Sequence, residues 1–195
     1  MMLRTNRIDR SEKGFSYIDV MIAIVILLVG VMALASALTA NLMRSYETES
    51  RIISKQMALS TIESIISARD IERPGTIEGW DSIGNVGTNP VNGQNKGVFL
   101  NGWAPIREEN GWDGVAGTAD DACPAGGPCN VSGRPSNTSA VYEGFLRRIV
   151  ISDVQDSERP SPPNPITRRR ISVTIKFFVN GYSRDEEVST LITNY

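Results

Sequence analysis

Residues 14–43 read GFSYIDVMIAIVILLVGVMALASALTANLM, and this stretch decides the fold of the chain. Its segment from Val20 to Met43 contains 24 residues without a charged side chain. Because a helix needs about 20 apolar residues to cross the hydrocarbon core of a bilayer, this segment predicts a transmembrane helix. The residues before Gly14 carry four basic and two acidic side chains. This basic flank predicts a cytoplasmic N-terminus and an exported C-terminal part.

The residues alone leave three interpretations of this stretch open. The simplest is a single-pass signal anchor. The second is a secretory signal peptide, because the triplets 33–35 (ALA) and 35–37 (ASA) both fit the small-residue pattern of a cleavage site. Helix-forming sequence continues past both triplets, which argues against that cut. The third follows from Asp19, because a carboxylate near the start of a membrane span is costly and marks a candidate functional site.

Glycine and proline are unevenly distributed along the 195 residues. Of 17 glycines and 10 prolines, only Gly14 and Gly30 precede Pro74. Residues 15–73 therefore predict one helix that ends near Arg73, membrane-spanning over about residues 20–43. Its second half is predicted to bury an apolar stripe. That stripe comprises Ile52, Ala58, Leu59, Ile62, Ile65 and Ile66. A stalk beyond the membrane anchor is the alternative, although the sequence has no sustained heptad repeat.

Residues 13–34, KGFSYIDVMIAIVILLVGVMAL, resemble the prepilin signal of type IV pilins and type II secretion pseudopilins. That family has a short basic leader ending in glycine, then phenylalanine, then an acid five residues into the mature chain, then an apolar helix. Residues 26–35 (ILLVGVMALA) look most like the PilV-type minor pilins, the type IV pilus modification group. The resemblance covers about residues 10–60, and leader, junction, acid and span occur in the family's order.

The resemblance implies that residues 1–14 are a prepilin leader, cut between Gly14 and Phe15 by prepilin peptidase, and that Phe15 is N-methylated. It also implies that Asp19 is the assembly acid, which pairs with the N-terminal amine of a neighbouring subunit. The family residue is normally glutamate, so Asp19 keeps the charge on a side chain one methylene shorter. A carboxylate among apolar helices needs a counter-charge, and the α-amine of Phe15 would supply it.

Residues 74–140 are rich in glycine, proline, asparagine and aspartate and predict loops with short strands. Val98–Trp103 is the best strand candidate in this variable region. In an exported chain, the closely spaced Cys123 and Cys129 of CPAGGPC predict a local disulfide. A redox-active pair is the alternative, but such pairs more usually have the spacing C-x-x-C.

The composition bears on several kinds of chemistry. The chain has no histidine, which excludes a Ser-His-Asp or Cys-His mechanism and every His-ligated zinc site. With 20 Lys and Arg against 22 Asp and Glu, nothing suggests a nucleic-acid partner. Asp113, Asp120 and Asp121 fit either a solvated turn or a calcium loop, although the EF-hand spacing is missing. We therefore expect no enzyme activity, no cofactor and no metal.

From residue 141 to the end, apolar residues recur with a period of two. Residues 141–152, 171–179 and 182–193 predict three antiparallel strands, and Asn180-Gly181 predicts a two-residue hairpin turn between the last two. A sheet with one apolar face needs a cover, and the amphipathic half of the long helix provides one. The predicted fold is α+β, with a C-terminal antiparallel sheet packed on the second half of an N-terminal helix, which is the pilin-like arrangement that the resemblance implies.

Pairing across the hairpin sets Lys176 opposite Asp185 on the outer face of the sheet. It also sets Ile175 opposite Glu186, which would place a carboxylate on the buried face. A bulge or fraying near the turn would relieve that conflict. The arginines 168–170 fit either a solvated strand start or a phosphate or lipid-headgroup site.

The sequence thus predicts a structural protein, a minor pilin of a type IV pilus. A type II secretion pseudopilin and a single-pass anchored periplasmic binding protein are the alternatives. The expected location is the bacterial inner membrane, with the N-terminus cytoplasmic and the C-terminal domain periplasmic, and then the pilus or pseudopilus. The implied partners are other pilin subunits, prepilin peptidase, the inner-membrane pilus assembly machinery and membrane lipid.

Overall fold

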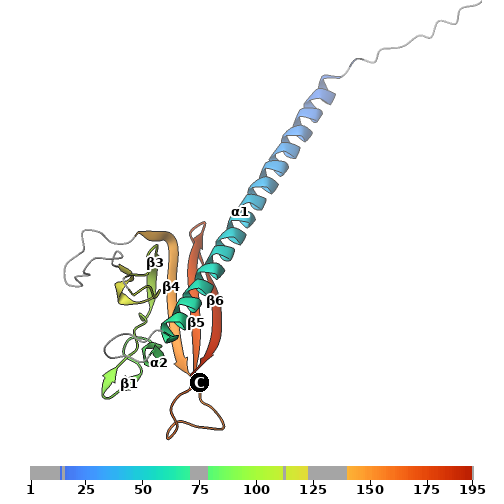
Figure 1. The fold of residues 1–195 in the computed structure, drawn as a ribbon. Helices are drawn as coiled ribbons and strands as arrows, with labels where there is room; N and C mark the ends of the chain where they lie inside the picture. Colours follow the sequence, from blue (N-terminus) through green and yellow to red (C-terminus); the bar gives the residue numbers. More distant parts are fainter. Residues whose placement is uncertain (1–13, 15, 71–78, 112, 123–139, 195) are drawn as a thin grey trace, which may run out of the picture. The chain divides into compact units, whose positions relative to one another are not determined.

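The computed structural model describes residues 14, 16–70, 79–111, 113–122 and 140–194 (Figure 1). Its helices are α1 (Tyr17–Asp70), α2 (Gly79–Ser82) and the 3-10 helix η1 (Ala119–Ala122). Its strands are β1 (Pro90–Val91), β2 (Gln94–Asn95), β3 (Trp103–Arg107), β4 (Val141–Asp153), β5 (Arg168–Val179) and β6 (Tyr182–Thr193). The chain divides within α1 into two compact units, which we call the stem (Met1–Ser45) and the head (Tyr46–Tyr195). The long N-terminal helix and the C-terminal antiparallel sheet confirm the predicted α+β class.

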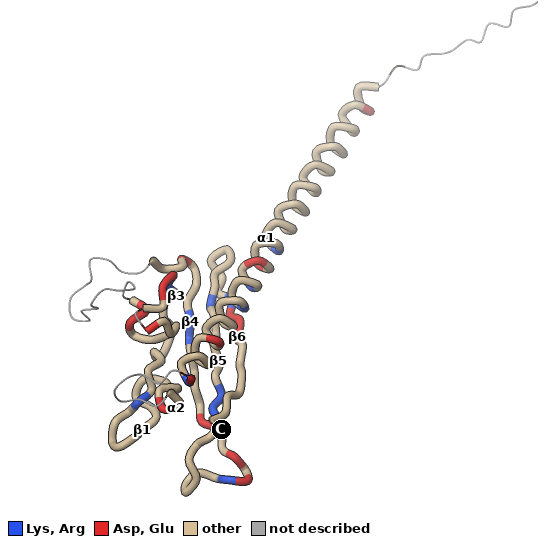
Figure 2. The backbone as a smooth tube through the Cα atoms, viewed as in Figure 1, with Lys and Arg blue, Asp and Glu red and all other residues tan. Residues whose placement is uncertain are grey.

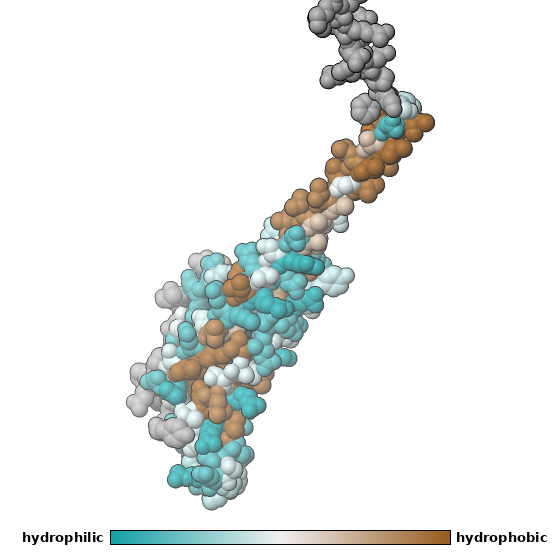
Figure 3. Space-filling model, turned by 90° about the vertical axis from the view of Figure 1, so that its right-hand side faces the viewer, coloured by the Kyte–Doolittle hydropathy of each residue, from teal (hydrophilic) through white to brown (hydrophobic). Residues whose placement is uncertain are grey.

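The stem part of α1 exposes apolar side chains on all sides, and Figure 3 shows this surface in brown. Every residue from Tyr17 to Ser45 is exposed. Between Asp19 and Arg44 the helix carries no charge, as the tan segment of Figure 2 shows. Soluble proteins rarely expose an apolar surface of this extent. In the described part of the chain, α1 is the one helix that is long and apolar enough to cross a membrane.

The head contains a four-stranded antiparallel sheet in the order β3-β4-β5-β6. The predicted hairpin between β5 and β6 is confirmed. Its turn residues Asn180 and Gly181 have φ angles of 52° and 79°, which is the left-handed pair that a tight two-residue hairpin turn requires. Lys176 pairs with Asp185 across the hairpin, as the alternation predicted.

The core of the head lies between the sheet and the part of α1 that belongs to the head. Ala58, Ile62 and Ile65 of α1 are buried against strand residues such as Ile171 and Val173. The buried hydrophobic cluster comprises Ala58, Ile62, Ile65, Ala68, Trp80, Ile83, Phe99, Ile106, Val115, Ile149, Ile171, Val173, Ile175 and Ile192. Each large apolar side chain buried in this way is worth roughly 1.5–3 kcal/mol, so the sheet holds the helix by ordinary core packing.

The predicted stripe on α1 was wrong at two positions. Ile52 and Leu59 are about half exposed, whereas Ser54 and Thr61 are buried. The two hydroxyls are satisfied locally, because each donates a hydrogen bond of 2.8 Å to the carbonyl four residues earlier in the helix. A hydroxyl that finds a backbone acceptor on its own helix loses most of the penalty for burial. The buried face of the helix is therefore rotated about the helix axis relative to the predicted stripe, and the two faces overlap at Ala58, Ile62 and Ile65.

The expected bulge or fraying at Glu186 was also wrong, because β5 and β6 pair in continuous register from Arg168 to Thr193. Glu186 does face the helix side of the sheet, opposite Ile175. Its carboxylate lies 2.8 Å from Nε of Arg51 and 3.9 Å from Nζ of Lys55, both on α1. Counter-charges from the helix, rather than an irregular strand, thus accommodate the carboxylate on this face.

The variable region contributes a strand, but not the predicted one. β3 begins at Trp103, where the prediction ended, and Phe99 lies in the core, where it makes an isolated bridge to Asn85. The side chain of Asn85 pairs with the β4 backbone: its amide donates to the carbonyl of Ile149 (2.9 Å) and its oxygen accepts from the amide of Ile151 (2.8 Å). The side chain of Asn85 thus satisfies backbone groups of β4 that lie beyond Trp103, the first residue of β3.

Of the three arginines that open β5, Arg169 is buried in the structure. Its guanidinium stacks 4.5 Å from the ring of Trp80, donates to the carbonyls of Trp80 and Ile83, and pairs with Asp153. Arg168 pairs with Asp156 at 3.1 Å. Arg169 therefore links the segment around α2 to the sheet. Neither interpretation of residues 168–170, a solvated strand start or a phosphate or lipid-headgroup site, describes this role.

Candidate functional site

The first turn of α1 is closed by Ser16 and Asp19. The carbonyl of Ser16 accepts hydrogen bonds from the amides of Asp19 (2.9 Å) and Val20 (3.3 Å), so Ser16 is the N-cap. In return, the amide of Ser16 donates to Oδ2 of Asp19 at 3.3 Å. This is the backward half of a capping box, in which the residue at the third helical position satisfies the amide of the cap. Asp19 thus has a structural role that requires no partner molecule.

The environment of Asp19 also permits a second role. Its side chain is exposed, and the next charged residue along the helix is Arg44. A carboxylate at the edge of an apolar surface is stabilised when a cation approaches, and more so when that surface becomes buried. A negative charge in the first turn also interacts favourably with the helix dipole. The site can therefore bind a cationic group that approaches along the apolar helix.

A shallow recess of about 280 Å³ lies beside Asp19 and is lined by Val20, Ala23, Ile24 and Leu27. One of these residues, Ala23, has a side chain of only one methyl group. Small residues on a membrane-type helix allow a neighbouring helix to approach closely. The recess and the carboxylate together make the start of α1 a candidate helix–helix contact with one charged position.

The predicted processing junction lies at the limit of the described chain. Gly14 is exposed, and Phe15, the expected cleavage and methylation residue, lies outside the described residues. Cys123 and Cys129 also lie outside them, so their disulfide stays a prediction. The expected helix end near Arg73 likewise falls beyond the described part of α1, which runs to Asp70.

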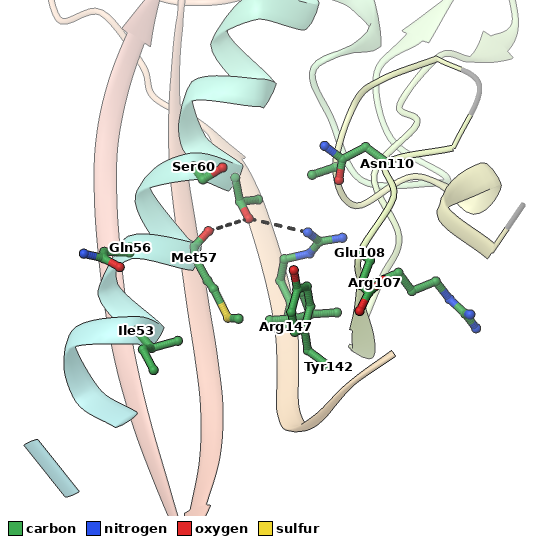
Figure 4. Close-up of a pocket in the computed structure, with 12 residues that line it drawn as sticks. Ile53, Gln56, Met57, Ser60, Arg107, Glu108, Asn110, Tyr142 and Arg147 are labelled. Atoms are coloured by element: carbon green, nitrogen blue, oxygen red, sulfur yellow. Dashed lines mark hydrogen bonds between the residues drawn. The ribbon is translucent and has the colours of Figure 1, made fainter. Parts of the chain in front are cut away.

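A second candidate site is a pocket of about 380 Å³ in the head (Figure 4). Figure 4 shows Gln56 and Ser60 of α1 on one side of it and Glu108 and Asn110, which follow β3, on the other. Arg147 of β4 contributes to the pocket wall between them. The lining mixes polar and apolar groups, as small-molecule sites do.

The buried cation of this pocket, Arg147, is already paired. Nη2 of Arg147 lies 2.6 Å from Oδ2 of Asp121, and the two side chains are 5% and 8% exposed. Nη1 also lies 3.5 Å from the hydroxyl of Thr61 on α1. Burial lowers the pKa of Arg147, and the carboxylate of Asp121 opposes that shift. The pair joins α1, β4 and the segment that carries η1, which makes it a structural link rather than a free anion-binding group.

The acidic residues near η1 are engaged within their own loop. Asp113 accepts from the amide of Val115 at 2.7 Å, and Asp120 accepts from the amide of Asp113 at 3.1 Å. Asp121 accepts from the amide of Gly117 at 2.8 Å. Among the described residues, no group of three His, Cys, Asp or Glu side chains is placed to hold a metal ion. These carboxylates stabilise the loop by accepting hydrogen bonds from its backbone amides.

Sequence reasoning missed two features of these sites. The cap of α1 could have been found from Ser16-x-x-Asp19, which has the capping-box spacing with aspartate in place of glutamate. The pair between Asp121 and Arg147 had no such signal, because 26 residues separate its members and both types are usually exposed.

No protein-family model, curated protein or solved structure matches this chain. The fold and the two sites therefore define its class only as a chain with one long apolar N-terminal helix and an α+β head. Any narrower assignment has to come from the residues and their geometry.

Proposed function

We propose that this chain is a minor pilin subunit of a type IV pilus, processed by prepilin peptidase and incorporated into the filament or priming its assembly. The observation that carries the proposal is the position of Asp19. It is a single exposed carboxylate in the first turn of a helix that is otherwise uncharged up to Arg44. A basic leader ending in Gly14 comes before it. A carboxylate at the start of a membrane span is costly, and the capping bond to Ser16 leaves it free to accept from a further partner.

In this function the protein acts by assembly. The apolar part of α1 first spans the inner membrane, with the head in the periplasm. In the filament, the same surface packs against the equivalent helices of other subunits. Its exposed side chains include Ile22, Val25, Leu28 and Val29, and each gains roughly 1.5–3 kcal/mol when it is fully removed from water. The exposed stem is thus suited to successive burial in lipid and in protein.

Asp19 fixes the axial position at which the apolar helices of neighbouring subunits pack against one another. After the cut behind Gly14, the new α-amine of Phe15 in a neighbouring subunit would supply a matching cation. In a low-dielectric filament core an unpaired carboxylate would be strongly destabilising, so subunits dock where amine and carboxylate meet. The capping bond to Ser16 uses Oδ2, and a carboxylate can accept further hydrogen bonds.

Two alternatives remain beside this proposal. A type II secretion pseudopilin would use the same helix and the same acid. A single-pass anchored periplasmic binding protein is favoured by one observation, the pocket lined by Gln56, Glu108 and Asn110. In that case Asp19 serves only as a helix cap.

Three substitutions at Asp19 separate the assembly role from the capping role. Asp19→Ala removes both the charge and the acceptor, Asp19→Asn keeps an acceptor oxygen without the charge, and Asp19→Glu keeps both. The measurement is the amount of each variant in sheared filaments relative to the amount in the membrane fraction. We expect Asp19→Glu to be incorporated, and Asp19→Ala and Asp19→Asn to remain in the membrane. Incorporation of Asp19→Asn at the parental level would assign Asp19 to the cap alone.

A further inference from the structure

The tyrosines of the head gather at one end of it. Tyr46, Tyr142 and Tyr182 are 65%, 43% and 73% exposed, and they are all the tyrosines in the described part of the head. Phe178 is 50% exposed beside the hairpin turn. Exposed aromatic side chains that gather in one region mark a candidate contact surface.

Pairing and ion contacts place these residues at the same end of the sheet, with Tyr182 on the helix side and Phe178 on the opposite face. Tyr182 and Phe178 flank the β5–β6 turn, and Arg184 of the same hairpin lies 3.5 Å from Glu47, the residue after Tyr46. β4 begins at the same end of the sheet, because Phe145 pairs with Phe177 and Tyr142 lies three residues earlier. Figure 1 shows the β5–β6 turn and the start of β4 at one end of the sheet. We call Tyr46, Tyr142, Phe178 and Tyr182 the aromatic rim.

The rim is the part of the head that the chain connects most directly to the apolar segment. Only Arg44 and Ser45 separate Met43, the last residue of that segment, from Tyr46. Three residues span at most about 11 Å even when fully extended. If residues 20–43 cross the bilayer, the backbone of Tyr46 lies within about 11 Å of the end of that segment, whatever angle the head adopts.

The length of the helix agrees with this position. Tyr46 lies 29 positions after Tyr17, which is the exposed tyrosine at the other end of the apolar segment. At 1.5 Å per residue this corresponds to roughly 44 Å. A bilayer including its headgroups is about 40–45 Å thick. The two tyrosines thus bracket one bilayer, as interfacial aromatic residues do.

We propose that the aromatic rim seats the head on the outer surface of the membrane that α1 crosses, with its rings at the level of the lipid headgroups. The inference rests on the membrane span in the proposed function and adds a lipid-binding surface on the head. Tyrosine suits this layer because its ring is apolar and its hydroxyl can still bond to water or phosphate. Near the rim, Arg184 is paired with Glu47. We expect the rim to engage a zwitterionic surface without a requirement for anionic lipid.

The test uses the full-length chain in phosphatidylcholine vesicles whose acyl chains are brominated near the headgroup, since bromine quenches nearby tryptophan. Tyr182→Trp places the probe in the rim. Leu191→Trp is the matched control, because Leu191 is 51% exposed on β6 near the opposite end of the same hairpin. The signal is the tryptophan fluorescence of each variant minus that of the parent chain. It is compared between brominated and ordinary vesicles.

We expect the fluorescence added at position 182 to be quenched several-fold more than that added at position 191. Equal quenching at the two positions would overturn the proposal. Flotation of the vesicles after alkaline washing tests the span separately. A chain that floats without selective quenching at Tyr182 refutes the rim and leaves the span intact, whereas a chain that does not float refutes both.

Discussion

Removal of the Asp121 carboxylate is predicted to destabilise the head strongly. The side chains of Asp121 and Arg147 are 8% and 5% exposed, so Asp121→Ala leaves a guanidinium that water can hardly reach. The guanidinium then keeps a 3.5 Å hydrogen bond to the hydroxyl of Thr61. The amide of Gly117 also loses its 2.8 Å acceptor. Breaking a buried pair by removing one partner typically costs about 3–5 kcal/mol.

In a unit of the size of the head, a loss of that order lowers the midpoint of thermal unfolding by about 10 °C. The assay is thermal unfolding of the full-length chain in mild detergent, followed by near-ultraviolet circular dichroism of the head's aromatic residues. Asp70→Ala is the control, since it breaks the exposed pair between Arg69 and Asp70. Exposed pairs contribute little, so the midpoint of this variant should fall far less than that of Asp121→Ala.

A double variant tests the reasoning further. Asp121→Leu with Arg147→Met replaces the pair by apolar groups and leaves no charge buried. Such replacements are often neutral or stabilising, so the double variant should unfold within a few degrees of the parent. The explanation is refuted if Asp121→Ala behaves like Asp70→Ala, or if the double variant is as unstable as the single one.

Three further predictions concern other contacts of the head. Glu186→Gln removes the partner of Arg51, and we expect a loss of about 1 kcal/mol in urea unfolding that largely disappears in high salt, because one member of the pair is exposed. Asn85→Ala leaves an amide and a carbonyl at the edge of β4 without their partner. This variant should lose about 2–3 kcal/mol of unfolding free energy in the same assay. Asn85→Gln should not restore the lost stability. The hydrogen bond from Arg69 lowers the pKa of Asp70. The stability that this pair contributes should therefore be present above the ordinary pKa of the carboxyl and decrease as the pH falls through the lowered value. The difference in stability between the parent and Asp70→Asn across an acid titration measures this contribution.

The parts of the fold that sequence reasoning predicted are those governed by local patterns. The charge-free segment ending at Met43 predicted the long apolar helix, and Asn180-Gly181 predicted the hairpin with its register. Each depends on a rule that acts over a few neighbouring residues: the length of an apolar run, or the backbone angles of a turn.

The parts that were missed depend on partners distant in the sequence. Ser54 could not be recognised as buried without knowing that its helix presents that face to the sheet. Glu186 seemed misplaced because its counter-charges, Arg51 and Lys55, come from another element about 130 residues earlier. The buried Arg147 is explained only by a carboxylate from a loop. Long-range electrostatic pairing leaves no periodic signature, so hydrophobic patterns predicted the layers and not the links between them.

The proposal that the chain is a processed pilin can be tested at the mature N-terminus. The measurement is intact mass spectrometry, with N-terminal sequencing, of the protein purified from its native membrane. We expect a chain that begins at N-methylated Phe15, with residues 1–14 removed. A chain that retains Met1, or one that begins at Ser36 or Leu38 after a signal-peptidase cut, would contradict it.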